Sequence, residues 1–248
     1  LFYGQKAELV MVSDSAESVR QHVGALSFDP VSREEFQLTG YVTGSDTLYA
    51  RVKQVQAGEF VEVSFGSSEP SITQERHFRF LHTESNKKSE DDLLTELDGC
   101  ATRSIERLIR YADGRQIVVP LSGGYDSRAI VTLLAKLAYP NVLAFSYGSP
   151  GNKESVVSER VAQSLEIPWH FVEYSKEKWR QIRNTRLLAD YQQFASGFSS
   201  LPSVQDWLAV KEMKEQHVIT PDAIFVPGHA GDFIAGSHIP HAARPLVP

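Results

Sequence analysis

Cysteine is almost absent from the sequence. Among 248 residues there is a single cysteine, Cys100. One cysteine excludes an intrachain disulfide and fits the reducing environment of the cytoplasm, where we expect the protein to reside. Cys100 stands beside the apolar positions of a helical pattern, and free cysteines are usually buried. We therefore expect it to be a small core residue.

Long apolar runs and a basic excess are missing as well. No apolar run approaches membrane-spanning length, and the first residues, LFYGQKAELV, lack the basic-then-apolar layout of a signal peptide. The formal net charge is -6, and basic residues occur only in isolated pairs such as Lys87 and Lys88. These absences predict neither a membrane nor a nucleic acid as partner. They leave the oligomeric state open, a homodimer included.

Residues 1–81 have the character of a β-rich region. The patterns predict strands at 7–12, 49–55 and 59–65, the last two meeting at a turn, and a short helix at 15–23 capped by Ser13 or Ser15. Residues 82–92 are polar and charged with no apolar period, so we expect a linker there.

Residues 93–248 have a different rhythm. Leucine, isoleucine and alanine recur at three- and four-residue steps from 93 to 109, which predicts an amphipathic helix. Strand and helix patterns then alternate: strands at 116–121, 141–147, 169–174 and 223–227, and helices at 127–137, 154–165 and 204–216. This alternation predicts an α/β fold, a parallel sheet with helices on both faces.

The turn SGGYDS, Ser122 to Ser127, follows the first of these strands and precedes a helix. Ligands of such sheets bind at the carboxyl ends of the strands. Glycines permit positive φ and close backbone approach, and a helix N-terminus favours an anion. Ser122 and Ser127 can donate to phosphate oxygens, whereas Asp126 suits a phosphate only with a bridging Mg²⁺ ion. The turn therefore indicates a polyphosphate with its metal.

Two other phosphate loops do not match this turn, and one alternative to the interpretation remains. The turn lacks the lysine of GxxxxGK[ST] and is not GxGxxG, so it matches neither of those phosphate loops. It could also be an ordinary tight turn between strand and helix, because Gly-Gly is common there.

SGGYDS resembles the SGGxDS pyrophosphate loop of the N-type ATP pyrophosphatases, which cleave ATP between its α and β phosphates. Residues 40–63 resemble the end of the glutaminase domain of the asparagine synthetase family within that group. AFSYG followed by Glu154 resembles its second strand, and VPGHAGDFIAGSH resembles its SGEGxDExFGGY segment. In that segment His229 and Phe233 stand where the family has acids. The resemblance implies an adenine nucleotide alpha hydrolase-like fold preceded by a remnant of an N-terminal-nucleophile glutaminase domain.

The resemblance also implies site residues. It places Mg²⁺ on Asp126 and Asp232, and it places His229 near the reacting carboxyl as a catalytic candidate. Residues 199–203 match a segment near the substrate carboxylate, although a plain loop is the alternative there. The positions implied to hold pyrophosphate and the rest of ATP are Leu121, Ser122, Gly123, Gly124, Asp126, Ser127, Phe145, Ser146, Tyr147, Gly148, Pro227 and Gly228.

The histidines leave other interpretations open. His229, Asp232, His238 and His241 carry side chains that bind zinc. Their spacing fits no zinc motif known to us, and the stretch is glycine-rich rather than helical. All three histidines could equally be loop residues.

The reaction implied is that of an asparagine synthetase. A carboxylate, aspartate or another, attacks ATP to give an acyl-adenylate and pyrophosphate, and ammonia derived from glutamine then forms the amide. Alternatives are a ligase for another carboxylate, similar to β-lactam synthetases, and a non-catalytic nucleotide-binding regulator.

The ends of the sequence bear on activity. The chain begins at Leu1 and ends in HAARPLVP, so we expect both ends to be cut. On this view 1–81 is the rear of a glutaminase-type domain without its nucleophile, and 93–248 is a truncated synthetase domain. We expect such a fragment to bind nucleotide without forming product.

Overall fold

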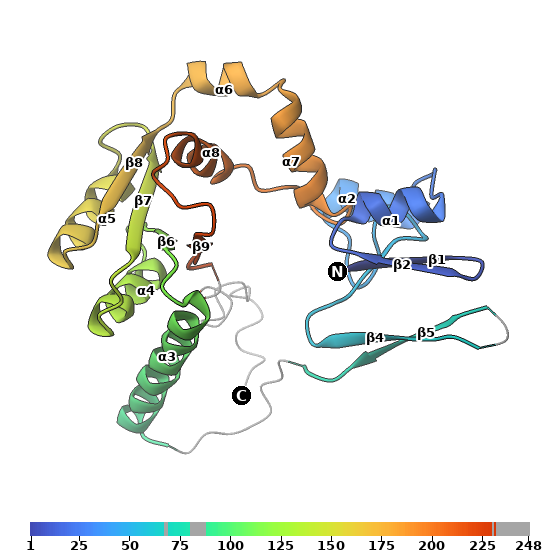
Figure 1. The fold of residues 1–248 in the computed structure, drawn as a ribbon, viewed down its shortest axis with the longest axis horizontal. Coiled ribbons are helices and arrows are strands. Elements are labelled where there is room, and N and C mark those ends of the chain that lie inside the picture. The colour runs from blue at the N-terminus through green and yellow to red at the C-terminus, as the bar shows by residue number, and fades with distance from the viewer. Residues whose placement is uncertain (67–68, 80–87, 230, 232–248) are drawn as a thin grey trace. The chain divides into compact units, whose positions relative to one another are not determined.

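The structure is a computed structural model that describes residues 1–66, 69–79, 88–229 and 231. It divides into two compact units (Figure 1). The first unit comprises Leu1–Ser85 and Arg180–Val204, and the second comprises Asn86–Trp179 and Gln205–Pro248. Residues 180–204 therefore belong to the first unit, although they fall within the range 93–248 that we expected to form one domain.

A three-stranded antiparallel sheet forms the centre of the first unit. Strands β1 (Phe2–Lys6) and β2 (Leu9–Ser13) make a hairpin, and β3 (Lys53–Gln54) pairs with the other edge of β1. Helix α1 (Ala16–Val23) follows β2, and the Ser15 side chain caps its first turn as predicted. Strand β1 was not predicted, because FYGQK shows little alternation of apolar and polar residues.

A separate hairpin lies in the same unit. Strand β4 (Glu59–Ser64) pairs antiparallel with β5 (Ser71–Arg76). The turn predicted between strands at 49–55 and 59–65 is present at 57–58, but the strands it joins do not pair with each other, because β3 joins β1 instead. Helix α2 (Pro30–Thr39) was also not predicted. A local pattern marks a strand without identifying the strand that pairs with it.

Hydrogen bonds and a ring contact explain why residues 180–204 belong to the first unit. Helix α6 (Lys176–Ile182) leads into α7 (Arg186–Ser196), and the chain after α7 bonds to the first unit. The Leu48 N–H donates to the Phe198 carbonyl at 2.7 Å. The Phe198 ring meets the Tyr49 ring edge-on, with centroids 5.0 Å apart.

A four-stranded parallel sheet forms the centre of the second unit. Its strands are β6 (Ile117–Pro120), β7 (Val142–Gly148), β8 (Trp169–Glu173) and β9 (Ile224–Phe225). Their order is β8-β7-β6-β9, and every neighbouring pair is parallel. The predicted parallel α/β sheet is confirmed.

Helices cover both faces of this sheet. They are α3 (Glu90–Ala112), α4 (Tyr125–Lys136), α5 (Lys153–Ser164) and α8 (Trp207–Glu215). Ile117 and Val119 point to one face and pack into a core with α3, α4 and α5. Val118 points to the opposite face and packs against Ala209 of α8. Residues of one strand thus enter two separate cores, which confirms the predicted layers.

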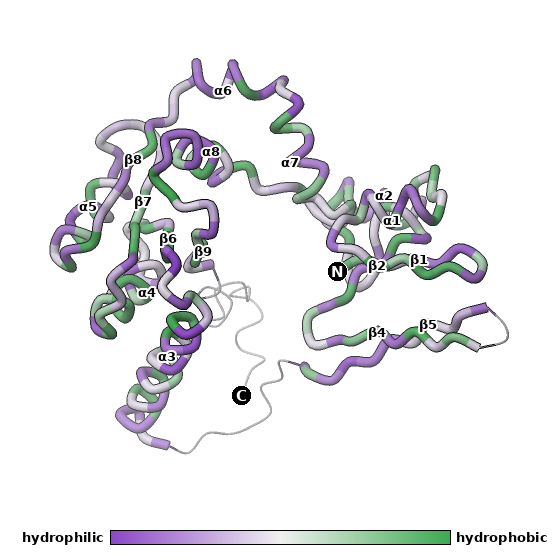
Figure 2. Tube along the Cα trace, viewed as in Figure 1, coloured by the Kyte–Doolittle hydropathy of each residue, from purple (hydrophilic) through white to green (hydrophobic). Residues whose placement is uncertain are grey.

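Helix α3 is longer than predicted. Apolar side chains in its first half are not covered by any of the described residues. Figure 2 shows apolar and polar residues alternating around it. Its second half reaches the core through Ile105, whereas Leu94 and Leu97 in the first half are exposed. Cys100 is exposed too, so the expectation of a core cysteine was wrong. None of the described helices is both long and apolar enough to cross a membrane.

Candidate functional site

The order of the strands creates a crevice beside β6. From β6 the chain moves to β7 and β8 on one side, whereas β9 pairs with the opposite edge of β6. The strand order therefore reverses at β6, and the segments that follow β6 and β9 meet at the carboxyl edge of the sheet. In parallel sheets, ligands bind at such a switch point.

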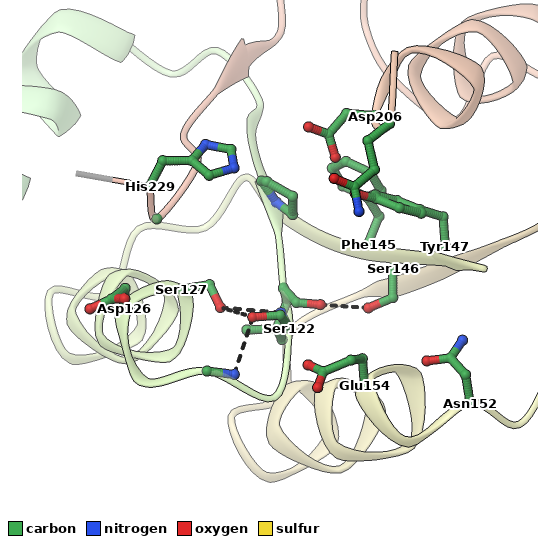
Figure 3. Close-up of a pocket in the computed structure, with 15 residues that line it drawn as sticks. Ser122, Asp126, Ser127, Phe145, Ser146, Tyr147, Asn152, Glu154, Asp206 and His229 are labelled. Atoms are coloured by element: carbon green, nitrogen blue, oxygen red, sulfur yellow. Dashed lines mark hydrogen bonds between the residues drawn. The ribbon is translucent and has the colours of Figure 1, made fainter. Parts of the chain in front are cut away.

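A cavity of about 350 Å³ opens at this point (Figure 3). Segments after β6, β7 and β9 line it, together with the chain that enters α8. Its lining residues are Pro120, Leu121, Ser122, Gly124, Asp126, Ser127, Phe145, Ser146, Tyr147, Asn152, Glu154, Gln205, Asp206, Gly228 and His229. The sequence-predicted positions are thus largely brought together, and all of these residues belong to the second unit.

Serine hydroxyls hold the loop after β6 in a closed turn. The Ser127 hydroxyl accepts a hydrogen bond from the Ser122 N–H at 3.1 Å, and the two hydroxyls lie 3.2 Å apart. The Ser122 hydroxyl also accepts from the Gly124 N–H at 3.1 Å. No side chain caps α4, which begins at this loop. The first N–H groups of α4 are therefore left to bind a ligand, and a helix N-terminus favours an anion.

The glycines of this loop provide space. Gly124 has a φ of -72° and Gly123 is not among the glycines with positive φ, so neither uses the left-handed conformation that glycine permits. A Cβ on Gly123 would lie 2.8 Å from a carboxylate oxygen of Glu154. That carboxylate accepts a hydrogen bond from the Gly123 N–H at 2.5 Å. Only glycine lets Glu154 approach the loop so closely.

A chain of hydrogen bonds anchors the loop to the sheet. The Ser146 hydroxyl donates to the Leu121 carbonyl at 2.6 Å and lies 2.5 Å from the Ser158 hydroxyl. The Trp169 indole N–H donates to Ser158 at 2.7 Å. Because Ser146 donates to Leu121, the Ser158 proton must point to Ser146. The hydroxyl protons of Ser146 and Ser158 then both have an acceptor.

Asp126 and His229 line the cavity from different loops. Asp126 lies in the first turn of α4, and His229 follows β9. A Cβ on Gly231 would lie 2.2 Å from an Asp126 carboxylate oxygen, so the segment after β9 passes directly over this carboxylate. Among the described residues no group of three His, Cys, Asp or Glu side chains could hold a metal. The zinc interpretation also needed Asp232, His238 and His241, which lie outside the described residues.

The part of the cavity lined by Tyr147 and Asp206 is aromatic and acidic. The Tyr147 and Tyr174 rings stack with centroids 4.8 Å apart. Burial raises the pKa of the Tyr147 phenol, and its hydrogen bond to Asp206 raises it further. Burial also raises the pKa of Tyr174. Both phenols are therefore uncharged donors at neutral pH.

A few predicted positions are not in the lining. Gly123 contacts Glu154 from the loop, and Gly148 and Pro227 do not line the cavity. Residues 199–203 belong to the first unit, and Asp232 lies outside the described residues.

Sequence reasoning did not assign five lining residues to the site: Pro120, Asn152, Glu154, Gln205 and Asp206. The sequence carries a helix-start signal at two of them. Asn152 caps α5, and the Asp-Trp-Leu start of α8 is a typical helix beginning.

A parallel sheet with the loop SGGYDS at its switch point defines the class of PP-loop ATP pyrophosphatases. Residues 106–244 match the family model described as asparagine synthase, which covers more than half of the chain. The chain therefore belongs to the asparagine synthase family.

Two further comparisons were made. The solved NH3-dependent NAD synthetase from Campylobacter jejuni subsp. jejuni NCTC 11168, in complex with the nitrate ion, is 17% identical to the chain, with a TM-score of 0.34. The similarity covers 49% of this chain and 52% of that one, so the chain spans about half of that protein. No curated protein matches the chain.

Proposed function

We propose that the protein is an ATP-dependent amide ligase that activates a carboxylate as its acyl-adenylate and releases pyrophosphate. One observation carries the proposal: the Ser122–Ser127 loop lines a cavity at the switch point of the sheet, with an uncapped helix N-terminus behind it. N–H groups, hydroxyls and a helix dipole in one place suit the departing pyrophosphate.

The loop would act by positioning and by charge stabilisation. Breaking the bond between the α and β phosphates leaves new negative charge on pyrophosphate, and fixed donors stabilise it without reorganising. The hydroxyls of Ser122 and Ser127 can rotate from each other to phosphate oxygens. His229, on the opposite loop, would lie beside the reacting carboxyl group.

Mg²⁺ fits this cavity only together with phosphate oxygens. The ion is usually held by one or two carboxylates plus phosphates. We expect Asp126 to hold it, because this carboxylate lies in the first turn of α4 and lines the cavity. The ion would supply further neutralisation of phosphate charge.

Aspartate is the acid we propose, and glutamine the source of nitrogen. Membership of the asparagine synthase family supports both choices. Another carboxylate would leave the roles of the loop and of Asp126 unchanged, since these residues act on ATP.

The test begins with binding and ends with products. Binding of Mg²⁺-ATP to the 248-residue chain is measured by calorimetry, and products are then identified by ³¹P NMR for the full-length protein, with aspartate and either glutamine or ammonia present. Aspartate-dependent AMP and pyrophosphate are the expected products. Asp126→Asn should abolish them, whereas the exposed Asp222→Asn, outside the cavity, should not.

Three outcomes would count against the proposal. ADP and phosphate would indicate a different cleavage of ATP. Tight binding without pyrophosphate from any acid would indicate a nucleotide-binding regulator. Equal activity of Asp126→Asn and the wild type would remove Asp126 from the site.

A further inference from the structure

The side chain of Asp206 is free to face the cavity. Asp206 is the N-cap residue of α8, yet its carboxylate makes no capping hydrogen bond. Its backbone is helical (φ -85°, ψ -19°) rather than extended as in a usual N-cap, which leaves the carboxylate unused in capping. Here the half-buried carboxylate instead lines the cavity (Figure 3), and it bonds to the Tyr147 hydroxyl.

Tyr174 holds the start of α8 in place of the missing cap. Its hydroxyl donates to the Gln205 carbonyl at 2.7 Å and accepts from the Ala209 N–H at 3.0 Å. The same ring stacks on Tyr147. The backbone at Asp206 and the hydroxyl that bonds to its carboxylate are therefore fixed by one aromatic pair, which suits a recognition group.

The position of Asp206 assigns it to one end of a bound nucleotide. The phosphates belong at the Ser122–Ser127 loop, where the N–H donors are. Phe145 and Tyr147 supply the aromatic surface of the cavity, which suits a base. A carboxylate repels phosphate, and no lysine or arginine is among the residues described as lining the cavity. The group that meets Asp206 must therefore be a hydrogen-bond donor.

We propose that Asp206 recognises the nucleoside, by accepting a hydrogen bond from the exocyclic amine of adenine or from a ribose hydroxyl. This inference rests on the proposed function, because it takes ATP as the ligand of the cavity. We expect the amine to be the donor, since Asp206 adjoins the aromatic surface. A carboxylate would then exclude a base that carries a carbonyl oxygen at that position.

The experiment compares nucleotides on the full 248-residue chain. Dissociation constants are measured by calorimetry for ATP, ITP, 2′-deoxy-ATP and 3′-deoxy-ATP, with the wild type, Asp206→Asn and the control Asp222→Asn. ITP has an oxygen in place of the amine. A hydrogen bond to a charged group corresponds to about tenfold or more in affinity.

We expect wild type and Asp222→Asn to prefer ATP over ITP about tenfold or more. Asp206→Asn should weaken ATP binding and narrow that preference, because an amide can donate to the ITP oxygen. If the donor is a ribose hydroxyl, Asp206→Asn should instead narrow the preference for ATP over 2′-deoxy-ATP or over 3′-deoxy-ATP. That result also supports the inference.

Two results would overturn the inference. One is that Asp206→Asn leaves every preference unchanged while ATP still binds. The other is that it leaves the affinity for every nucleotide unchanged and weakens only the binding of aspartate in the same calorimetry, which would place Asp206 at the acid. If the wild type binds no ATP, the proposed function itself fails, and the inference with it.

Discussion

Replacing Ser158 with alanine should destabilise the second unit without touching the cavity. Ser158 is fully buried on α5, where it links Trp169 of β8 to Ser146 of β7. Ser146 in turn donates to the Leu121 carbonyl at the end of β6. One hydroxyl therefore completes a chain of hydrogen bonds that ties three strands to a helix.

The magnitude follows from what the substitution leaves unpaired. Without the Ser158 oxygen the Trp169 indole N–H loses its acceptor, and Ser146 loses a donor. An unsatisfied buried donor costs about 1–3 kcal/mol. Alanine in place of serine in a helix returns about 0.5 kcal/mol. The expected net loss is about 2 kcal/mol, which lowers the unfolding midpoint of the unit by about 4–8 °C.

Thermal unfolding followed by far-UV circular dichroism and tryptophan fluorescence measures the effect. Ser164→Ala is the matched control, because Ser164 lies on the same helix and its exposed hydroxyl bonds only to the Val161 carbonyl. Both substitutions gain the same helix propensity. The difference between their unfolding midpoints therefore measures the contribution of the buried hydrogen bonds. Equal midpoints for the two variants would refute the network.

Two further predictions concern close contacts. Glu154→Gln should tighten the binding of Mg²⁺-free ATP, because its carboxylate contacts the Gly123 N–H of the loop proposed to hold phosphate. Removing one charge about 5 Å from another in a water-like dielectric is worth about fourfold in affinity. Weaker binding in calorimetry would instead make Glu154 a favourable ligand contact. Gly4→Ala should destabilise the first unit by about 1–3 kcal/mol in urea unfolding, since its Cβ would lie 2.5 Å from the Arg51 carbonyl oxygen. Gly66→Ala is the control, with no atom within 4 Å of its Cβ, and equal midpoints would contradict the packing.

The parallel sheet was predictable because its strands carry their own signal. Residues such as Val118 and Val119 are buried on opposite faces, so the strand is a continuous apolar run bounded by turn residues. The first unit offered weaker signals. β1 contains polar residues and Gly4, and the partner of β4 could not be identified from a local pattern. The return of residues 180–204 to the first unit depends on contacts such as that of Phe198 with Tyr49, which no periodicity shows.

The site was predictable where it consists of one continuous loop. Ser122 and Ser127 lie five residues apart and meet through a turn that the sequence itself indicates. Glu154 and Asp206 come from the beginnings of two other helices, and only the order of the strands brings them to the same cavity. Glu154 lies in the first turn of α5 and Asp206 at the N-cap of α8, positions where acids are common because of the helix dipole. The missing cap of Asp206 is visible only in three dimensions.

The glycines after β9 let two loops pack closely. A Cβ on Gly228 would lie 2.9 Å from the Ser127 nitrogen, and one on Gly231 would lie 2.2 Å from an Asp126 oxygen. The loop therefore packs on the first turn of α4, and larger residues would push it away. Because His229 lies between these two contacts, its position is coupled to that of Asp126.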